Sequence, residues 1–155
     1  MTLVPDPPHA LTSTEGWNVK NNLSFLKNVV EILHKQGIRV SIFIEPDRNV
    51  IPWAKETGTD RIELYTGHYA RAFDTGISEL NAVIKKYIEA AEECLKEGIG
   101  INAGHDLNLR NLKFFIKNVP GVLEVSIGHA LISDAIFMGL PLTITLYKNC
   151  LKDTD

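Results

Sequence analysis

A helical pattern, a glycine and a short apolar segment follow one another four times along this chain of 155 residues. The four glycines are Gly37, Gly58, Gly98 and Gly121, and a glycine just past a helix end is the usual left-handed cap. Helices that alternate with short strands form parallel sheets, because each helix returns the chain to the same end of the sheet. The repeat therefore predicts an α/β fold built on a parallel sheet.

Hydrophobic spacing indicates where the elements of this repeat lie. Short apolar runs rich in β-branched residues are typical of buried parallel strands, and they occupy residues 39–44, 61–65, 99–103 and 123–127. Apolar residues spaced three and four apart predict helices at residues 21–35, 50–56, 77–96, 109–117 and 131–151. Pro141 divides the last region and is expected to begin its second helix.

Two architectures accommodate four such units: an open doubly wound sheet and half of an eight-stranded (β/α)8 barrel. A complete barrel usually needs about 250 residues, so this chain is too short for one. No polar linker or low-complexity segment divides the sequence, and residues 1–155 are therefore expected to form a single domain.

The composition excludes several classes of protein. The 16 basic and 19 acidic side chains give a net charge of −3, so no basic surface for nucleic acid is expected. No apolar run of about 18 residues is present, and the first residues lack the features of a signal peptide. The two cysteines are expected to be free thiols, which fits a cytoplasmic protein.

The residues that carry chemistry gather where the predicted strands end. Three of the five histidines, His68, His105 and His129, each follow a glycine directly after a strand. Active sites of parallel α/β folds lie at the carboxyl ends of the strands, and histidine transfers protons near neutral pH. We therefore expect these histidines to share a site.

Two further features point to the same edge of the sheet. Gly128 and His129 precede a short helical pattern, whose first N–H groups are suited to binding a phosphate. Glu63 lies within a strand on the same face as Arg61 and Tyr65; it points into the lumen of a curved sheet or into solvent from an open one. Glu45 could join these groups in a metal site, although no HxH or HxxxH spacing supports that interpretation.

Six segments occur in an order and spacing that resemble the pyridoxine 5′-phosphate synthase family. They are LVPD at 3–6, LTS at 11–13, VSIFI at 40–44, IELYTG at 62–67, NAGH at 102–105 and IGHA at 127–130. The resemblance implies a TIM (β/α)8 barrel that assembles into octamers and uses no cofactor. It also implies an enzyme of vitamin B6 biosynthesis that condenses 3-amino-2-oxopropyl phosphate with 1-deoxy-D-xylulose 5-phosphate, giving pyridoxine 5′-phosphate, inorganic phosphate and water.

The resemblance also assigns roles to individual residues. His105 matches the catalytic proton donor, Glu63 matches the carboxylate that stabilises the transition state, and Thr12 matches a loop threonine that contacts substrate. The phosphate of the amino-ketone would be held by Gly128, His129 and the backbone of Asp106. The family has no required histidine at the position of His68.

By the same resemblance, this chain is the C-terminal half of the barrel, strands five to eight. Residues 1–17 would be the end of a strand and an active-site loop, and residues 18–155 would be four α/β units and a terminal helix. The family's general-base glutamate, a second catalytic histidine and the groups that bind the other substrate have no counterpart. We therefore expect the chain alone to be inactive, and to be poorly soluble or to dimerise through its sheet edges. Its partner would be the N-terminal half or further copies of itself.

Two other functions stay open at this point. A small flavodoxin-like domain that binds phosphate or another protein would have a doubly wound sheet with helices on both faces. A metal-dependent barrel isomerase or hydrolase would retain zinc or manganese.

Overall fold

The computed structural model describes residues 1–152, except for the side chains of residues 77 and 78. Five strands form one sheet in which every neighbouring pair is parallel. The strands are β1 (Thr2–Leu3), β2 (Ser41–Ile44), β3 (Arg61–Tyr65), β4 (Gly100–Gly104) and β5 (Val122–Ser126). They lie side by side in the order in which they occur along the chain. In a doubly wound sheet the strand order reverses at a switch point. The sequential order observed here therefore does not fit the flavodoxin-like alternative.

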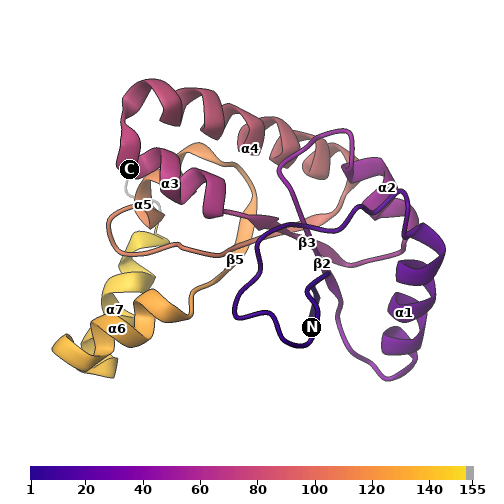
Figure 1. Cartoon of the computed structure of the whole chain (residues 1–155), viewed down its shortest axis with the longest axis horizontal. Helices are drawn as coiled ribbons and strands as arrows, with labels where there is room; N and C mark the ends of the chain where they lie inside the picture. Colours follow the sequence, from indigo (N-terminus) through magenta and orange to yellow (C-terminus); the bar gives the residue numbers. More distant parts are fainter. Residues whose placement is uncertain (153–155) are drawn as a thin grey trace.

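Helices connect these strands in the alternation that the repeat predicts. They are α1 (Leu23–Lys35), α2 (Ile51–Glu56), α3 (Gly67–Thr75), α4 (Ile77–Glu97), α5 (Leu112–Asn118), α6 (His129–Met138) and α7 (Leu140–Cys150). In Figure 1, α1, α2 and α4 follow one another around one face of the sheet, and the N-terminal segment lies on the other. No helix within the described residues is long and apolar enough to cross a membrane.

The hydrophobic core lies between the sheet and these helices. Side chains at alternate strand positions are completely buried in it, among them Ile42, Ile62 and Ile101. They pack with helix residues such as Leu26 of α1 and Tyr87 of α4. Burial of this apolar face is the main contribution to the stability of the sheet.

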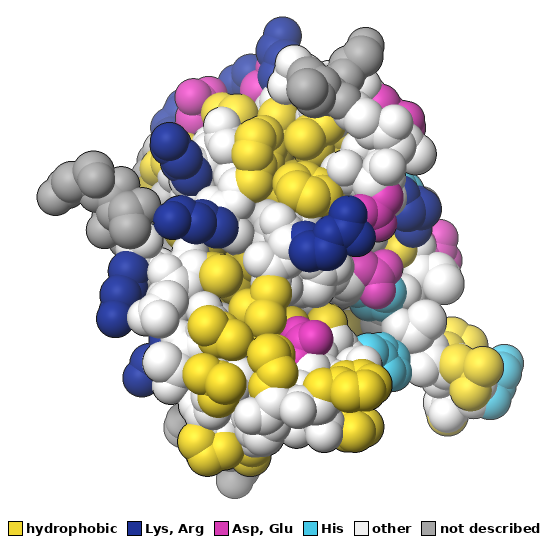
Figure 2. All heavy atoms as spheres, turned by 90° about the vertical axis from the view of Figure 1, so that its left-hand side faces the viewer, with side chains coloured by type: hydrophobic (Ala, Val, Ile, Leu, Met, Phe, Trp, Pro, Cys, Tyr) yellow, Lys and Arg dark blue, Asp and Glu magenta, His cyan; other side chains and the backbone are white. Residues whose placement is uncertain are grey.

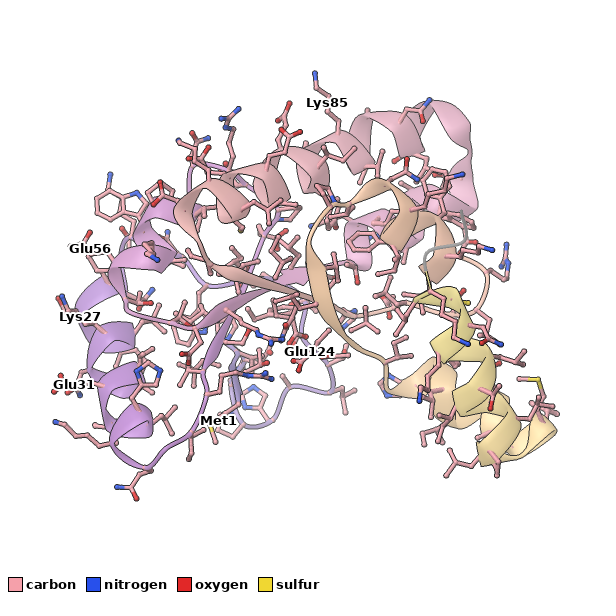
Figure 3. All side chains as sticks on the ribbon, turned by 180° about the vertical axis from the view of Figure 1, so that it is seen from behind. Met1, Lys27, Glu31, Glu56, Lys85 and Glu124 are labelled. Carbon is pink, nitrogen blue, oxygen red and sulfur yellow. The ribbon has the colours of Figure 1, made fainter. Side chains whose placement is uncertain are left out.

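The other face of the sheet is polar and curved. Glu124 on β5 accepts two hydrogen bonds from the Arg39 guanidinium, at 2.8 and 2.9 Å, and lies 3.0 Å from Nη1 of Arg61. Asn102 joins the same cluster, accepting from Arg61 at 3.0 Å and donating to Glu124 at 3.2 Å. Figure 3 labels Glu124 near the centre of the molecule. Because β2 and β5 would be roughly 14 Å apart in a flat sheet, the contact between Arg39 and Glu124 favours a sheet that curves around this cluster.

The structure corrects the sequence prediction in two places. Residues 67–75 form helix α3, which hydrophobic spacing did not indicate because the segment is short and begins with Gly67. The expected division of the last helical region is confirmed: it breaks at Gly139, whose φ is 78°, and α7 begins with Pro141 in its first turn. Helix α6 begins at His129, two residues earlier than predicted.

Helices α6 and α7 lie at the end of the fold and bury little of their apolar surface. Within the described residues, α6 has no buried side chain, and Ile136 and Phe137 are 76% and 87% exposed. Figure 2 shows hydrophobic side chains gathered on the lower part of that side of the molecule, where α6 and α7 lie.

Candidate functional site

A cavity of about 760 Å³ opens at the carboxyl ends of the strands, beneath the segment that follows β1. Its wall is formed by β3, the residues after β4 and β5, helix α3 and the first turn of α6. The six residues that the sequence singled out all line it: Thr12, Glu63, His105, Asp106, Gly128 and His129.

Glu63 lies in the buried wall of this cavity. The residue is 7% exposed, and its Oε2 accepts a 2.8 Å hydrogen bond from the Thr2 hydroxyl on β1. The carboxylate occupies space that only a glycine leaves free, because a Cβ on Gly104 would lie 2.2 Å from Oε1 of Glu63. The solvent-facing alternative for Glu63 is therefore wrong, and the carboxylate is held toward the concave face of the sheet.

The backbone at His105 adopts a conformation that side chains rarely tolerate. His105 and Asp106 have φ values of 89° and 59°, both in the left-handed region. The Thr66 hydroxyl holds this turn by donating to the carbonyl oxygens of Gly104, at 2.8 Å, and of His105. Strained backbone of this kind is typical of functional sites, since the surrounding structure must hold it in place.

The imidazole of His105 contacts Thr12 of the N-terminal segment and Tyr65 of β3. Its Nε2 lies 2.7 Å from the Thr12 hydroxyl, and its ring packs edge-on against Tyr65 with centroids 5.0 Å apart. Its Nδ1 lies 3.1 Å from Oδ2 of Asp106, but the two atoms are not aligned for a hydrogen bond. Among the residues that the structure describes, this buried Nδ1 has no hydrogen-bond partner, which indicates a role in binding or proton transfer.

Two hydrogen bonds to neighbouring residues fix the Tyr65 side of the site. The Tyr87 hydroxyl on α4 donates to the Tyr65 carbonyl at 2.6 Å. Burial raises the pKa of the Tyr87 hydroxyl, so it stays protonated and remains a donor. The Thr66 amide donates to the Gly104 carbonyl at 2.9 Å, which ties the end of β3 to that of β4.

The first turn of α6 forms the opposite side of the cavity. Gly128 is the N-cap of this helix of 10 residues, and its side-chain position faces open space. The helix has no side-chain cap, so its first N–H groups are available to an anion. His129 is the first residue of the helix and lines the cavity.

The segment that carries Thr12 is attached to the ends of β1 and β2. The Trp17 amide donates to the Phe43 carbonyl at 2.9 Å, and its indole donates to the Leu3 carbonyl at 3.1 Å. The Gly16 amide donates to Oε1 of Glu45 at 3.2 Å, and a Cβ on Gly16 would lie 2.4 Å from the Glu45 nitrogen. Glu45 therefore fixes this segment, a function that sequence reasoning did not assign to it.

The prediction that three Gly-His pairs share one site is wrong for His68. His68 lies in helix α3 and lines a neighbouring cavity of about 470 Å³, which Glu45 also lines. Arg71, one turn further along α3, does line the main cavity. Arg71 was not predicted because hydrophobic spacing does not indicate α3; the helix-forming residues Ala70 and Ala72 after Gly67 are the signal that could have indicated it.

Within the part of the chain that the structure describes, no three His, Cys, Asp or Glu side chains are grouped so that they could hold a metal ion.

Comparison with known proteins connects this cavity to a family. A family model described as "Pyridoxal phosphate biosynthesis protein PdxJ" matches residues 1–153. Relatives named pyridoxine 5′-phosphate synthase are 50% identical in Bacteroides thetaiotaomicron and 53% identical in Parabacteroides distasonis, each over 98% of this chain. The chain spans 63% of the length of both relatives.

A solved structure shows a similar fold at low sequence identity. The YdjI aldolase from Escherichia coli K12 superposes with a TM-score of 0.54 and 14% identity, over 87% of this chain and 54% of the aldolase. That likeness concerns the fold alone. The family match extends over almost every residue, including the strand ends and the segment that enclose the cavity. The chain therefore belongs to the PdxJ family of pyridoxal phosphate biosynthesis proteins.

Proposed function

We propose that this chain supplies the proton donor and the phosphate site of a pyridoxine 5′-phosphate synthase. The reaction is the condensation of 3-amino-2-oxopropyl phosphate with 1-deoxy-D-xylulose 5-phosphate. The observation that carries the proposal is the single cavity lined by Thr12, Glu63, His105 and the first turn of α6. Relatives with half of their aligned residues identical bear the name of this enzyme.

Each wall of the cavity suits one part of this chemistry. The open first turn of α6, with Gly128 and His129, is suited to the phosphate of the amino-ketone. His105 lies across the same cavity and would donate a proton to a departing oxygen, oriented by Thr12. The Glu63 carboxylate would stabilise positive charge on the amine as the new bonds form.

The proposal includes an incomplete barrel, in which this chain contributes strands five to eight. The sequential, all-parallel strand order supports this arrangement, as does the polar concave face. The relatives extend over additional residues, which would supply the remaining strands and the groups that bind the second substrate. Assembly would then join β1 and β5, the two edge strands of the present sheet, to that segment.

The test measures formation of pyridoxine 5′-phosphate by the chain alone and by the chain co-expressed with the unmatched segment of the Bacteroides thetaiotaomicron relative. We expect product only from the combination, and a loss of about 100-fold or more with His105→Asn, as for other general acids. Product from the chain alone would contradict the incomplete barrel. A combination that assembles but forms no product would contradict the synthase function.

A further inference from the structure

The cavity contains more negative than positive charge. Among the described residues that line it are three carboxylates, those of Glu63, Asp74 and Asp106, and a single lysine or arginine, Arg71. Asp74 is paired with Arg110, whose Nη2 lies 3.2 Å from Oδ1. The two other carboxylates repel a phosphate ester that enters this cavity, so a permanent cation in the cavity strengthens its binding.

The structure holds the guanidinium of Arg71 through His68, three residues earlier on α3. Nη2 of Arg71 lies 2.7 Å from Nδ1 of His68. A guanidinium can only donate, so Nδ1 must accept and the imidazole proton must reside on Nε2. That nitrogen lies 3.2 Å from Oε2 of Glu45. His68 is therefore hydrogen-bonded to a guanidinium on α3 and lies close to a carboxylate that follows β2.

The ring of His68 is also fixed by packing. It lies edge-on to Tyr65 with centroids 5.2 Å apart, on the ring that His105 contacts as well. Its bond to Arg71 occupies one of the five guanidinium N–H donors. The other donors remain to bind a ligand in the cavity that Arg71 lines.

We propose that Arg71 binds the phosphate group of the substrate, and that His68 positions Arg71 for this contact. The proposal rests on the proposed function, because it concerns the phosphorylated substrate of the same cavity. Arg71 on α3 and the open first turn of α6 line the same cavity. In this arrangement the guanidinium and the helix N–H groups would both bind the phosphate. Arginine suits this role because its planar group forms paired hydrogen bonds with phosphate oxygens.

The direct test is an NMR titration of the chain with inorganic phosphate. Phosphate should shift the Nε–Hε resonance of Arg71 and the backbone amides at Gly128 and His129, and should leave Arg48 unchanged. Arg71→Met should weaken binding by about tenfold or more, the typical contribution of a charge-assisted hydrogen bond. Lys113→Met is the matched control, since it removes one positive charge from an exposed position on α5 outside the cavity.

A second pair of variants separates positioning from structure. His68→Gln keeps an acceptor for Arg71 and a donor for Glu45, whereas His68→Leu keeps neither. We expect His68→Leu to weaken phosphate binding severalfold and His68→Gln to retain most of it, with the amide spectra of both variants otherwise unchanged. Equal binding by the two variants would contradict the positioning role.

The outcomes distinguish this inference from the proposed function. Phosphate that shifts the amides of α6 but binds Arg71→Met as tightly as the parent overturns the role of Arg71 and leaves the phosphate site intact. Phosphate that leaves both the α6 amides and Arg71 unshifted overturns the phosphate site itself, and Arg71 with it.

Discussion

At the scale of single residues, the site depends on a close contact between Gly104 and Glu63. Gly104→Ala places a Cβ 2.2 Å from Oε1 of Glu63, so either the carboxylate or β4 must move. We expect the substitution to destabilise the fold by about 1–3 kcal/mol, the usual cost of overpacking a buried site. Urea unfolding monitored by circular dichroism measures this difference.

Gly128→Ala is the matched control for that measurement. The space beside Gly128 is open and its φ of −102° lies outside the left-handed region that favours glycine, so its stability should stay within about 0.5 kcal/mol of the parent. Equal stabilities for the two alanine variants would show that the contact between Gly104 and Glu63 carries no constraint.

His105 shows what could be predicted about individual residues and what could not. The position of a Gly-His pair after a strand predicts that the imidazole lies at the active edge of a parallel sheet. The sequence pattern does not predict the left-handed turn at His105 and Asp106, because Thr66, at the end of the neighbouring strand, holds that turn through hydrogen bonds. His68 has the same local sequence signal, but it lies in helix α3 and lines a separate cavity.

At the scale of elements, Asp60 connects α1 to the sheet. Its Oδ2 accepts hydrogen bonds from the Val40 amide, at 2.7 Å, and lies 2.8 Å from Nε2 of His34 at the end of α1. Burial raises the pKa of the Asp60 carboxyl, but the Val40 amide and His34 outweigh it and hold the pKa below its ordinary value of 3.8.

This pKa gives a stability prediction with a defined sign. A depressed carboxyl pKa stabilises the fold above the unfolded value and ceases to do so as the pH falls through the folded value. Asp60→Asn should therefore lower the free energy of unfolding at pH 7 and have a smaller effect at pH 3. The difference should stay below about 1 kcal/mol because the side chain is 40% exposed. Urea unfolding at the two pH values measures it, and an effect that is larger at pH 3 would contradict it.

The elements themselves were predicted where hydrophobic spacing was strong. The four long strands and helices α1 and α4 lie close to their predicted positions, because each has a continuous apolar run or stripe that must be buried. Helix α3 escaped detection because three of its four buried residues, Gly67, Ala70 and Ala72, are small and give little hydrophobic periodicity. The break at Gly139 depends on a positive φ that spacing alone does not indicate.

At the scale of the whole molecule, the exposed apolar surface of α6 and α7 is a liability for the isolated chain. Ile136 and Phe137 are largely exposed, and apolar surface of this kind promotes association. We expect the chain to self-associate as its concentration rises, and Ile136→Glu combined with Phe137→Ser to reduce that association. Sedimentation velocity at several concentrations measures the change.

The control substitution for this experiment is Ile32→Glu on α1, where a comparable side chain is 51% exposed on another element. It should leave the association unchanged. A parent chain that sediments as a monomer at every concentration would contradict the prediction, and it would show that α6 and α7 need no cover.

The sequential strand order has a consequence for how the molecule is made. Every strand pairs only with the strands just before and after it in the chain, so each α/β unit finds its partner as soon as it leaves the ribosome. Translation proceeds at about 5–20 residues per second, which leaves each new strand time to pair before the next one emerges. The described part of the sheet is thus suited to growing from β1 toward β5 during synthesis.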